Sequence, residues 1–206
     1  HEDEDTDHDE DSHDHDEDSH DHEDESHGEQ DEHVWTSPKN AMRIVQKLCD
    51  ALCRLDPENA DDYQANTASY LASLTSLDEE FSDVTANASR HTIVFGDRFP
   101  FRYLTDDYGL NYYAAFAGCS AETEASFKTV SFLAKKVDEL KLPCVLTIEG
   151  NKHKIAETIV KNTAEKNQKV LTMDSMQSTT LKDVDKSATY LSIMEKNLSV
   201  LKKALN

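Results

Sequence analysis

The apolar residues between positions 37 and 87 follow the spacing of two consecutive α-helices. Ser37 and Pro38 supply an N-cap and a first-turn proline for the first helix. Its apolar stripe has 3-4-3 spacing at Met42, Val45, Cys49 and Leu52. Asp56-Pro57 interrupts the pattern, and a second stripe then continues to about residue 87 through Tyr63, Tyr70, Leu74, Leu77, Phe81 and Val84. Some 30 residues at ~1.5 Å each span roughly 45 Å, so this helix is long enough to link two lobes.

After this helix the pattern changes to an alternation of short apolar runs with amphipathic stretches. It predicts strands at Thr92–Phe95, Tyr112–Phe116, Cys144–Ile148 and Lys169–Met173. Between and after them it predicts helices at Pro100–Tyr108, Glu122–Leu140, Lys152–Lys166 and Asp185–Leu205. This order and these lengths favour an α/β lobe with a parallel four-stranded sheet covered on both faces.

Binding sites of parallel α/β sheets lie at the carboxyl ends of the strands. In this chain those ends are Gly96-Asp97-Arg98, Gly118-Cys119, Glu149-Gly150 and Asp174-Ser175. We therefore expect the functional residues of the lobe among these four segments.

Residues 1–30 contain no aliphatic or aromatic residue and consist mainly of Asp, Glu and His. Such a segment cannot bury enough apolar area to offset the ordering of its backbone, so we expect it to be disordered. The chain has a formal net charge of -21, and residues 1–32 hold 19 of its 42 acidic residues and none of its 21 Lys and Arg. The remainder is nearly neutral, and nothing in it predicts a nucleic-acid partner.

The four cysteines are too few for a disulfide framework. Cys49 and Cys53 lie one helical turn apart, and Cys119 and Cys144 are expected at opposite ends of the sheet. We therefore expect free, mostly buried thiols. No apolar run approaches the roughly 20 residues needed to cross a bilayer. The opening His1-Glu2-Asp3 lacks a signal sequence, and we interpret it as a cut end that says little about the compartment.

The acidic segment contains seven of the ten histidines. Imidazole suits zinc, copper and nickel, and its mixture with carboxylates favours Zn²⁺. Histidines two residues apart do not share a helix face, so we predict a flexible chain that wraps the ion in weak, exchangeable sites. Seven histidines within 27 residues favour this role over that of a solubilising linker. The accessory metal ligands would be His8, His13, His15, His20, His22 and His27, together with His1.

Residues 31–38 have the sequence Asp-Glu-His-Val-Trp-Thr-Ser-Pro directly after the His-rich segment. This motif resembles the zinc/manganese substrate-binding proteins of bacterial ABC importers, in which a D-x-H-x-W-x-(S/D)-P motif carries a metal-binding histidine. The resemblance extends over residues 31–206, through Tyr103-Leu104, Asp107–Leu110, Lys154–Thr158 and Asp174-Ser175.

The resemblance implies two α/β lobes joined by a long helix, with metal held between them. The four predicted regions are 1–30 (metal gathering), 31–56 (motif and first helix), 57–90 (linking helix) and 91–206 (second lobe). We expect the first lobe, with its signal and its own histidine ligand, to lie outside this chain and to be its partner. The resemblance further implies an extracytoplasmic protein that delivers metal to an ABC permease, with membrane attachment only through a lipid anchor outside this chain.

Ligands are assigned one at a time. His33 matches the histidine of the motif, and Asp174 resembles the acidic ligand after the last strand. A third family ligand falls on Arg98, whose guanidinium stays protonated and cannot bind a metal. Either another residue replaces it or the site has changed; Glu149 is the best substitute, with a salt bridge to Arg98 as its alternative role. Neither remaining histidine is favoured, because His91 lies at the wrong end of a strand and His153 is expected to be exposed.

No nucleophile pair or phosphate-binding glycine loop is evident, so we expect no enzyme. The expected function is zinc capture for an importer. Two alternatives stay open: a metal buffer without a transport role, and a receptor for Mn²⁺, which oxygen ligands at Glu149 and Asp174 would suit.

Overall fold

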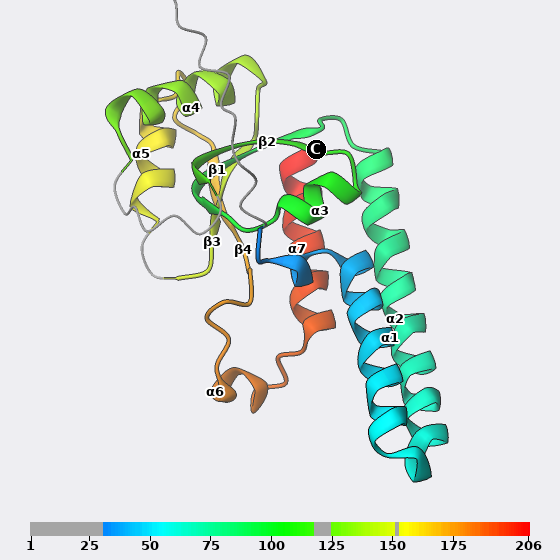
Figure 1. Cartoon of the computed structure of the whole chain (residues 1–206). Coiled ribbons are helices and arrows are strands. Elements are labelled where there is room, and N and C mark those ends of the chain that lie inside the picture. Colours follow the sequence, from blue (N-terminus) through cyan, green and yellow to red (C-terminus); the bar gives the residue numbers. More distant parts are fainter. Residues whose placement is uncertain (1–30, 118–124, 151–152) are drawn as a thin grey trace, which may run out of the picture. The chain divides into compact units, whose positions relative to one another are not determined.

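The computed structural model describes residues 31–117, 125–150 and 153–206. Their elements are a parallel sheet, helices on both of its faces, and a helical hairpin (Figure 1). The predicted disordered segment and its seven histidines lie outside the described residues, as does Cys119. Residues 31–206 form one compact unit.

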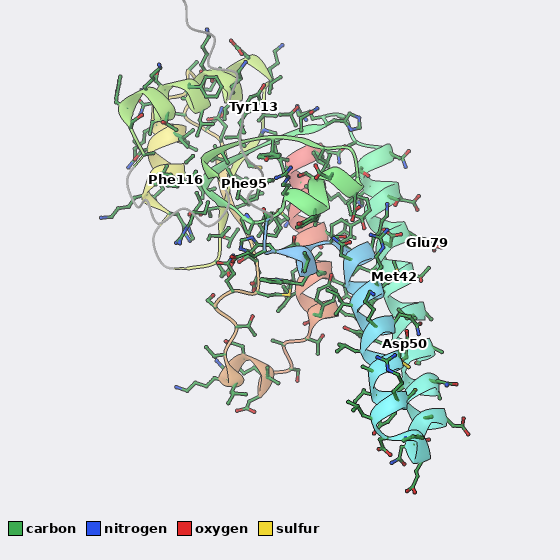
Figure 2. All side chains as sticks on the ribbon, viewed as in Figure 1. Met42, Asp50, Glu79, Phe95, Tyr113 and Phe116 are labelled. Atoms are coloured by element: carbon green, nitrogen blue, oxygen red, sulfur yellow. The ribbon has the colours of Figure 1, made fainter. Side chains whose placement is uncertain are left out.

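The hairpin begins with a single 3-10 turn, η1 (Val34–Thr36), and the helix α1 (Pro38–Leu55), which Ser37 caps by accepting a hydrogen bond from the backbone N–H of Asn40. A second turn, η2 (Pro57–Asn59), leads into α2 (Ala60–Ala86). The two predicted helices and their break at Asp56-Pro57 are confirmed. Figure 2 shows α1 and α2 side by side, with Met42 and Asp50 on α1 and Glu79 on α2.

The sheet contains four parallel strands in the order β2-β1-β3-β4. Their bounds are β1 (Thr92–Phe99), β2 (Asn111–Ala117), β3 (Cys144–Ile148) and β4 (Lys169–Met173). The last two match the predicted bounds. The first strand was predicted to stop at Phe95; it continues to Phe99 because an irregularity between Phe95 and Arg98 lets pairing with β2 resume.

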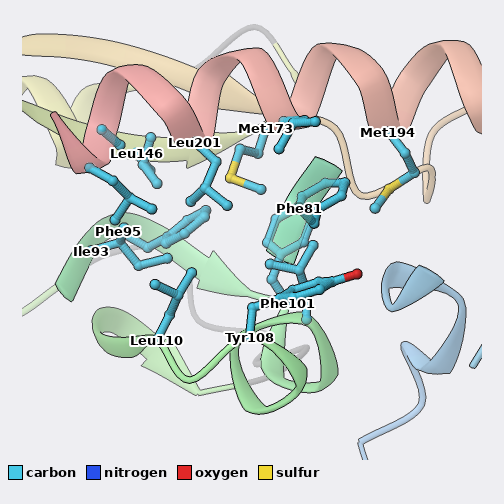
Figure 3. Close-up of a cluster of buried hydrophobic side chains, with 14 of the residues drawn as sticks. Phe81, Ile93, Phe95, Phe101, Tyr108, Leu110, Leu146, Met173, Met194 and Leu201 are labelled. Carbon is cyan, nitrogen blue, oxygen red and sulfur yellow. The ribbon is translucent and has the colours of Figure 1, made fainter. Parts of the chain in front are cut away.

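Helices cover both faces of the sheet, as predicted. On one face, α4 (Phe127–Glu139) and α5 (Lys154–Asn162) pack on Val94 and Val145. On the other, α2, α3 (Arg102–Asp107) and α7 (Tyr190–Leu205) enclose a larger core. Figure 3 shows this core, with Phe81 of α2 next to Tyr108 and with Phe95 and Phe101 lying between sheet and helices. A short helix, α6 (Leu181–Val184), precedes α7.

Three predicted helix boundaries were wrong by four or five residues. The helix α4 begins at Phe127 rather than Glu122, because Ser126 is its N-cap. The helix α5 ends at Asn162 rather than Lys166, which has a positive φ of 55°. Thr189 caps α7, so this helix begins at Tyr190 and the predicted start at Asp185 is a turn.

The three cysteines that the structure describes, Cys49, Cys53 and Cys144, are free, as expected. Cys49 and Cys144 are buried, and Cys53 is half-buried. Among the described helices, none combines the length and the apolar character that a membrane span requires.

Candidate metal site at the carboxyl edge of the sheet

His33 is a buried side chain, only 3% exposed, that the surrounding motif residues hold in place. The Thr36 hydroxyl lies 2.8 Å from the His33 carbonyl oxygen and 3.1 Å from that of Pro100. Trp35 packs edge-on against the imidazole, and its indole N–H donates to the carbonyl oxygen of Ser175 at 2.9 Å. The motif thus ties His33 both to the segment between β1 and α3 and to the segment after β4.

The imidazole of His33 is oriented by Asp31. Its Nδ1 lies 2.7 Å from Oδ1 of Asp31, and its backbone N–H donates to the same oxygen at 2.9 Å. A carboxylate can only accept, so Nδ1 carries the proton and Nε2 carries the lone pair. A carboxylate that fixes the tautomer in this way is the usual second partner of a metal-binding histidine. The Tyr103 hydroxyl donates a hydrogen bond to the carbonyl oxygen of Asp31 at 2.8 Å and so helps to fix the position of Asp31.

The Nε2 atom of His33 contacts the side-chain amide of Gln177. Gln177 belongs to the loop 174–178, which follows β4. A metal ion on Nε2 would therefore have to displace this amide.

Glu149, directly after β3, binds that same loop. Its Oε2 accepts from the backbone N–H of Ser175 at 2.7 Å, and its Oε1 accepts from the Ser175 hydroxyl at 2.7 Å and from the Gln177 N–H at 3.1 Å. No ion pair joins Glu149 to Arg98 in the described part of the chain. The alternative role as a salt-bridge partner is therefore wrong, and the carboxylate instead anchors the loop.

Asp174 begins the loop. The side chain of Asn197, from α7, bonds both its backbone N–H (2.7 Å) and its carbonyl oxygen (2.8 Å). Its Oδ1 accepts from the N–H of Met176 at 2.8 Å, whereas Oδ2 accepts no hydrogen bond from the described residues. Burial raises the pKa of this carboxyl above its ordinary range, and the nearby charge of Glu149 adds to the effect.

The three predicted ligands are thus gathered around one loop rather than around one point. His33 touches Gln177, Glu149 holds the loop backbone, and Asp174 opens it. Within residues 31–117, 125–150 and 153–206, no cluster of three His, Cys, Asp or Glu side chains has the spacing to hold a metal. The three assignments remain predictions.

A second group of hydrogen-bonded polar residues at this edge of the sheet, formed by Asp97, Thr147 and His153, was only partly predicted from the sequence. The Thr147 hydroxyl, fully buried, donates to Oδ2 of Asp97 at 2.8 Å and lies 3.1 Å from Nδ1 of His153. His153 was expected to be exposed but is half-buried, because this contact draws it onto the sheet. Only the position of Asp97, just after the predicted end of the first strand, could have indicated this group. Arg98 is exposed, and its backbone N–H donates to Asp97.

Comparisons with known proteins identify a family and several relatives of this chain. The family described as zinc-uptake complex component A, periplasmic, matches residues 2–204. The chain is 30% identical over 171 residues to the zinc-binding lipoprotein AdcA of Streptococcus pneumoniae. It is 27% identical over 173 residues to the high-affinity zinc uptake system protein ZnuA of Bacillus subtilis.

These matches cover most of this chain but only part of its relatives. They span 83% of the chain and 33% of the first protein, and 84% of the chain and 53% of the second. Among solved structures, the Zn(II)-bound ZnuA-like domain of S. pneumoniae AdcA aligns with a TM-score of 0.71 and 30% identity, covering 87% of this chain and 66% of that one. The chain therefore belongs to the family of the zinc-uptake complex component A.

Proposed function

We propose that this chain captures Zn²⁺ outside the cytoplasmic membrane and passes it to the permease of an ABC importer. The observation that carries the proposal is the buried pair of His33 and Asp31, which directs a lone pair on Nε2 toward the loop 174–178. The names of the relatives support the metal, and the role is one of binding rather than catalysis. We place the protein in the periplasm or on the cell surface for the same reason.

In this proposal Zn²⁺ binds Nε2 of His33 as Gln177 moves away. Asp174 offers Oδ2, which accepts no hydrogen bond from the described residues. Glu149 can join through Oε2, which accepts one backbone N–H. A bound cation would favour the ionised form of Asp174, whose burial now opposes it. Arg98 contributes no ligand.

Isothermal titration of the intact protein with Zn²⁺ tests the ligand assignment. We expect one tight step in addition to weaker ones, and loss of the tight step in His33→Ala. In Asp31→Asn the step should weaken by roughly 10- to 100-fold, as for other partners of metal-binding histidines. His91→Ala is the matched control, since His91 is exposed and precedes β1 at the other edge of the sheet. An unchanged tight step in His33→Ala would overturn the proposal.

The accessory role of residues 1–30 is tested by deleting them. A receptor for an importer keeps its tight site and loses only weak ones. A metal buffer, whose capacity lies in the seven histidines of this segment, would lose nearly all of its bound zinc. Competition between Zn²⁺ and Mn²⁺ for the tight step separates zinc capture from manganese capture.

A further inference from the structure

Two cysteines on α1 lie far from the sheet edge and take no part in the proposed zinc site. Cys49 and Cys53 are one turn apart, and their Sγ atoms are separated by 3.9 Å. Cys49 is 4% exposed, whereas Cys53 is half-buried and its Sγ lies 3.7 Å from the carbonyl oxygen of Ala60, at the start of α2. Both side chains are free thiols.

This separation suits a shared metal ion. Thiolates lie about 2.3 Å from Zn²⁺, and a tetrahedral angle between two of them puts the sulfurs about 3.8 Å apart. Helical side chains four residues apart point the same way, as in helical motifs that bind zinc through two histidines. With the two Sγ atoms 3.9 Å apart, metal binding therefore needs almost no rearrangement of the helix.

A disulfide is a much poorer fit. It requires sulfurs about 2.0 Å apart and Cβ atoms about 3.5–4.5 Å apart. Residues four apart on an α-helix have Cβ atoms about 5–6 Å apart, so closure would unwind α1. The separation of the two sulfurs is thus closer to the geometry of a metal chelate than to that of a disulfide.

We propose that Cys49 and Cys53 form a second metal site, a dithiolate chelate for a thiophilic divalent cation such as Zn²⁺ or Cd²⁺. Binding converts two thiols into two thiolates, forms two metal–sulfur bonds and releases two protons to solvent. The remaining coordination positions fall to solvent, so the site is weaker than one with four thiolates.

The surroundings of the pair favour a cation over free thiolates. Asp50 lies on the same helix, in the outer part of the hairpin that Figure 2 shows, and its negative charge is close enough to affect Cys53. Because binding releases protons from the thiols, metal uptake strengthens as pH rises.

Titration of the full, reduced chain with Cd²⁺ tests the proposal through the ultraviolet thiolate-to-cadmium charge-transfer band, which the histidines of residues 1–30 cannot produce. We expect the band to saturate at about one equivalent and to disappear in both Cys49→Ser and Cys53→Ser. Cys144→Ser and Cys119→Ser are matched controls that should keep it. Circular dichroism checks that each variant keeps its helices.

Calorimetry in two buffers of different ionisation enthalpy supplies a second readout, with release of about two protons per Cd²⁺ expected near neutral pH. A band that survives either α1 substitution, or a reduced wild-type chain without one, would overturn the proposal. His33→Ala separates the two sites, because it should leave this band unchanged whatever happens to the proposed zinc site.

Discussion

The helical hairpin and the α/β lobe both carry apolar stripes in the sequence, yet they bury them to very different extents. In the lobe, Phe95 and Leu133 are fully buried on opposite faces of the sheet. On α1, Leu52 of the predicted stripe is 44% exposed, and Leu48 and Leu55 are 57% and 83% exposed. Periodicity therefore identifies the apolar face of a helix but does not say what covers it.

The helix α2 passes from one region to the other. All of its buried residues lie in its second half, at Leu74, Leu77, Phe81 and Thr85, and none lies between Ala60 and Ser73. The second half packs against α7 and the large core, whereas the first half pairs with α1. One continuous helix thus carries a stabilising end and an end that contributes little burial.

The largest expected effect compares the core of the lobe, which the second half of α2 enters with Phe81, with the exposed face of α1. Phe81→Ala empties a fully buried position that stacks on Tyr108 at 5.2 Å, so it should lower the free energy of unfolding by about 3–5 kcal/mol. Leu55→Ala, on the exposed face of α1, should change it by less than about 0.5 kcal/mol. Urea-induced unfolding measures both values. Similar losses in the two variants would show that the hairpin is as tightly packed as the lobe.

A smaller effect is expected where β1 meets α5. A Cβ atom added at Gly96 would lie 2.4 Å from Cα of Ala156, and backbone atoms cannot yield as a flexible side chain does. Gly96→Ala should therefore destabilise the lobe by about 1–3 kcal/mol, with a lower midpoint of thermal unfolding. Asn66→Ala, at an exposed position in the first half of α2, is the control and should leave the midpoint nearly unchanged. An unaltered midpoint in Gly96→Ala would mean that α5 can move away freely.

The smallest expected effect on the free energy of unfolding near neutral pH comes from Cys144, a buried thiol of the lobe. Burial raises the pKa of Cys144 from 9.0 to about 12. The folded state then keeps a proton that the unfolded chain gives up. The stabilisation is complete below about pH 9 and is lost as pH rises toward 12, with a slope of at most about 1.4 kcal/mol per pH unit.

Comparing wild type with Cys144→Ala in denaturant titrations at about pH 8 and about pH 10 isolates this contribution. The stability advantage of the wild type should shrink at the higher pH. Cys53→Ala, in the hairpin, is the matched comparison and should show a shallower change, since Cys53 is more exposed. An advantage that stays constant between the two conditions would contradict the assigned pKa.

Much of the fold follows from the sequence because local rules and burial agree there. The strands β3 and β4 have their predicted bounds, since each is a short apolar run between turns. Helix ends were less predictable, as at α7. The residues that could serve as N-cap differ little in free energy, and the packing of neighbouring segments decides between them. His33 was predicted as a ligand from the resemblance of its motif, and Asp31, Trp35 and Thr36 of that motif contact it in the structure.

The sequence by itself determined the order of the elements and the parallel α/β class, because these follow from the apolar spacing within each element and from the alternation of strands and helices. Only the tertiary structure decided what the other site residues touch. Glu149 anchors the loop 174–178, and Thr147 joins Asp97 to His153, through contacts between segments that spacing along the chain does not specify. A carboxylate can accept from backbone, hydroxyl or metal with similar ease, so its partner depends on which strands and loops the fold brings together.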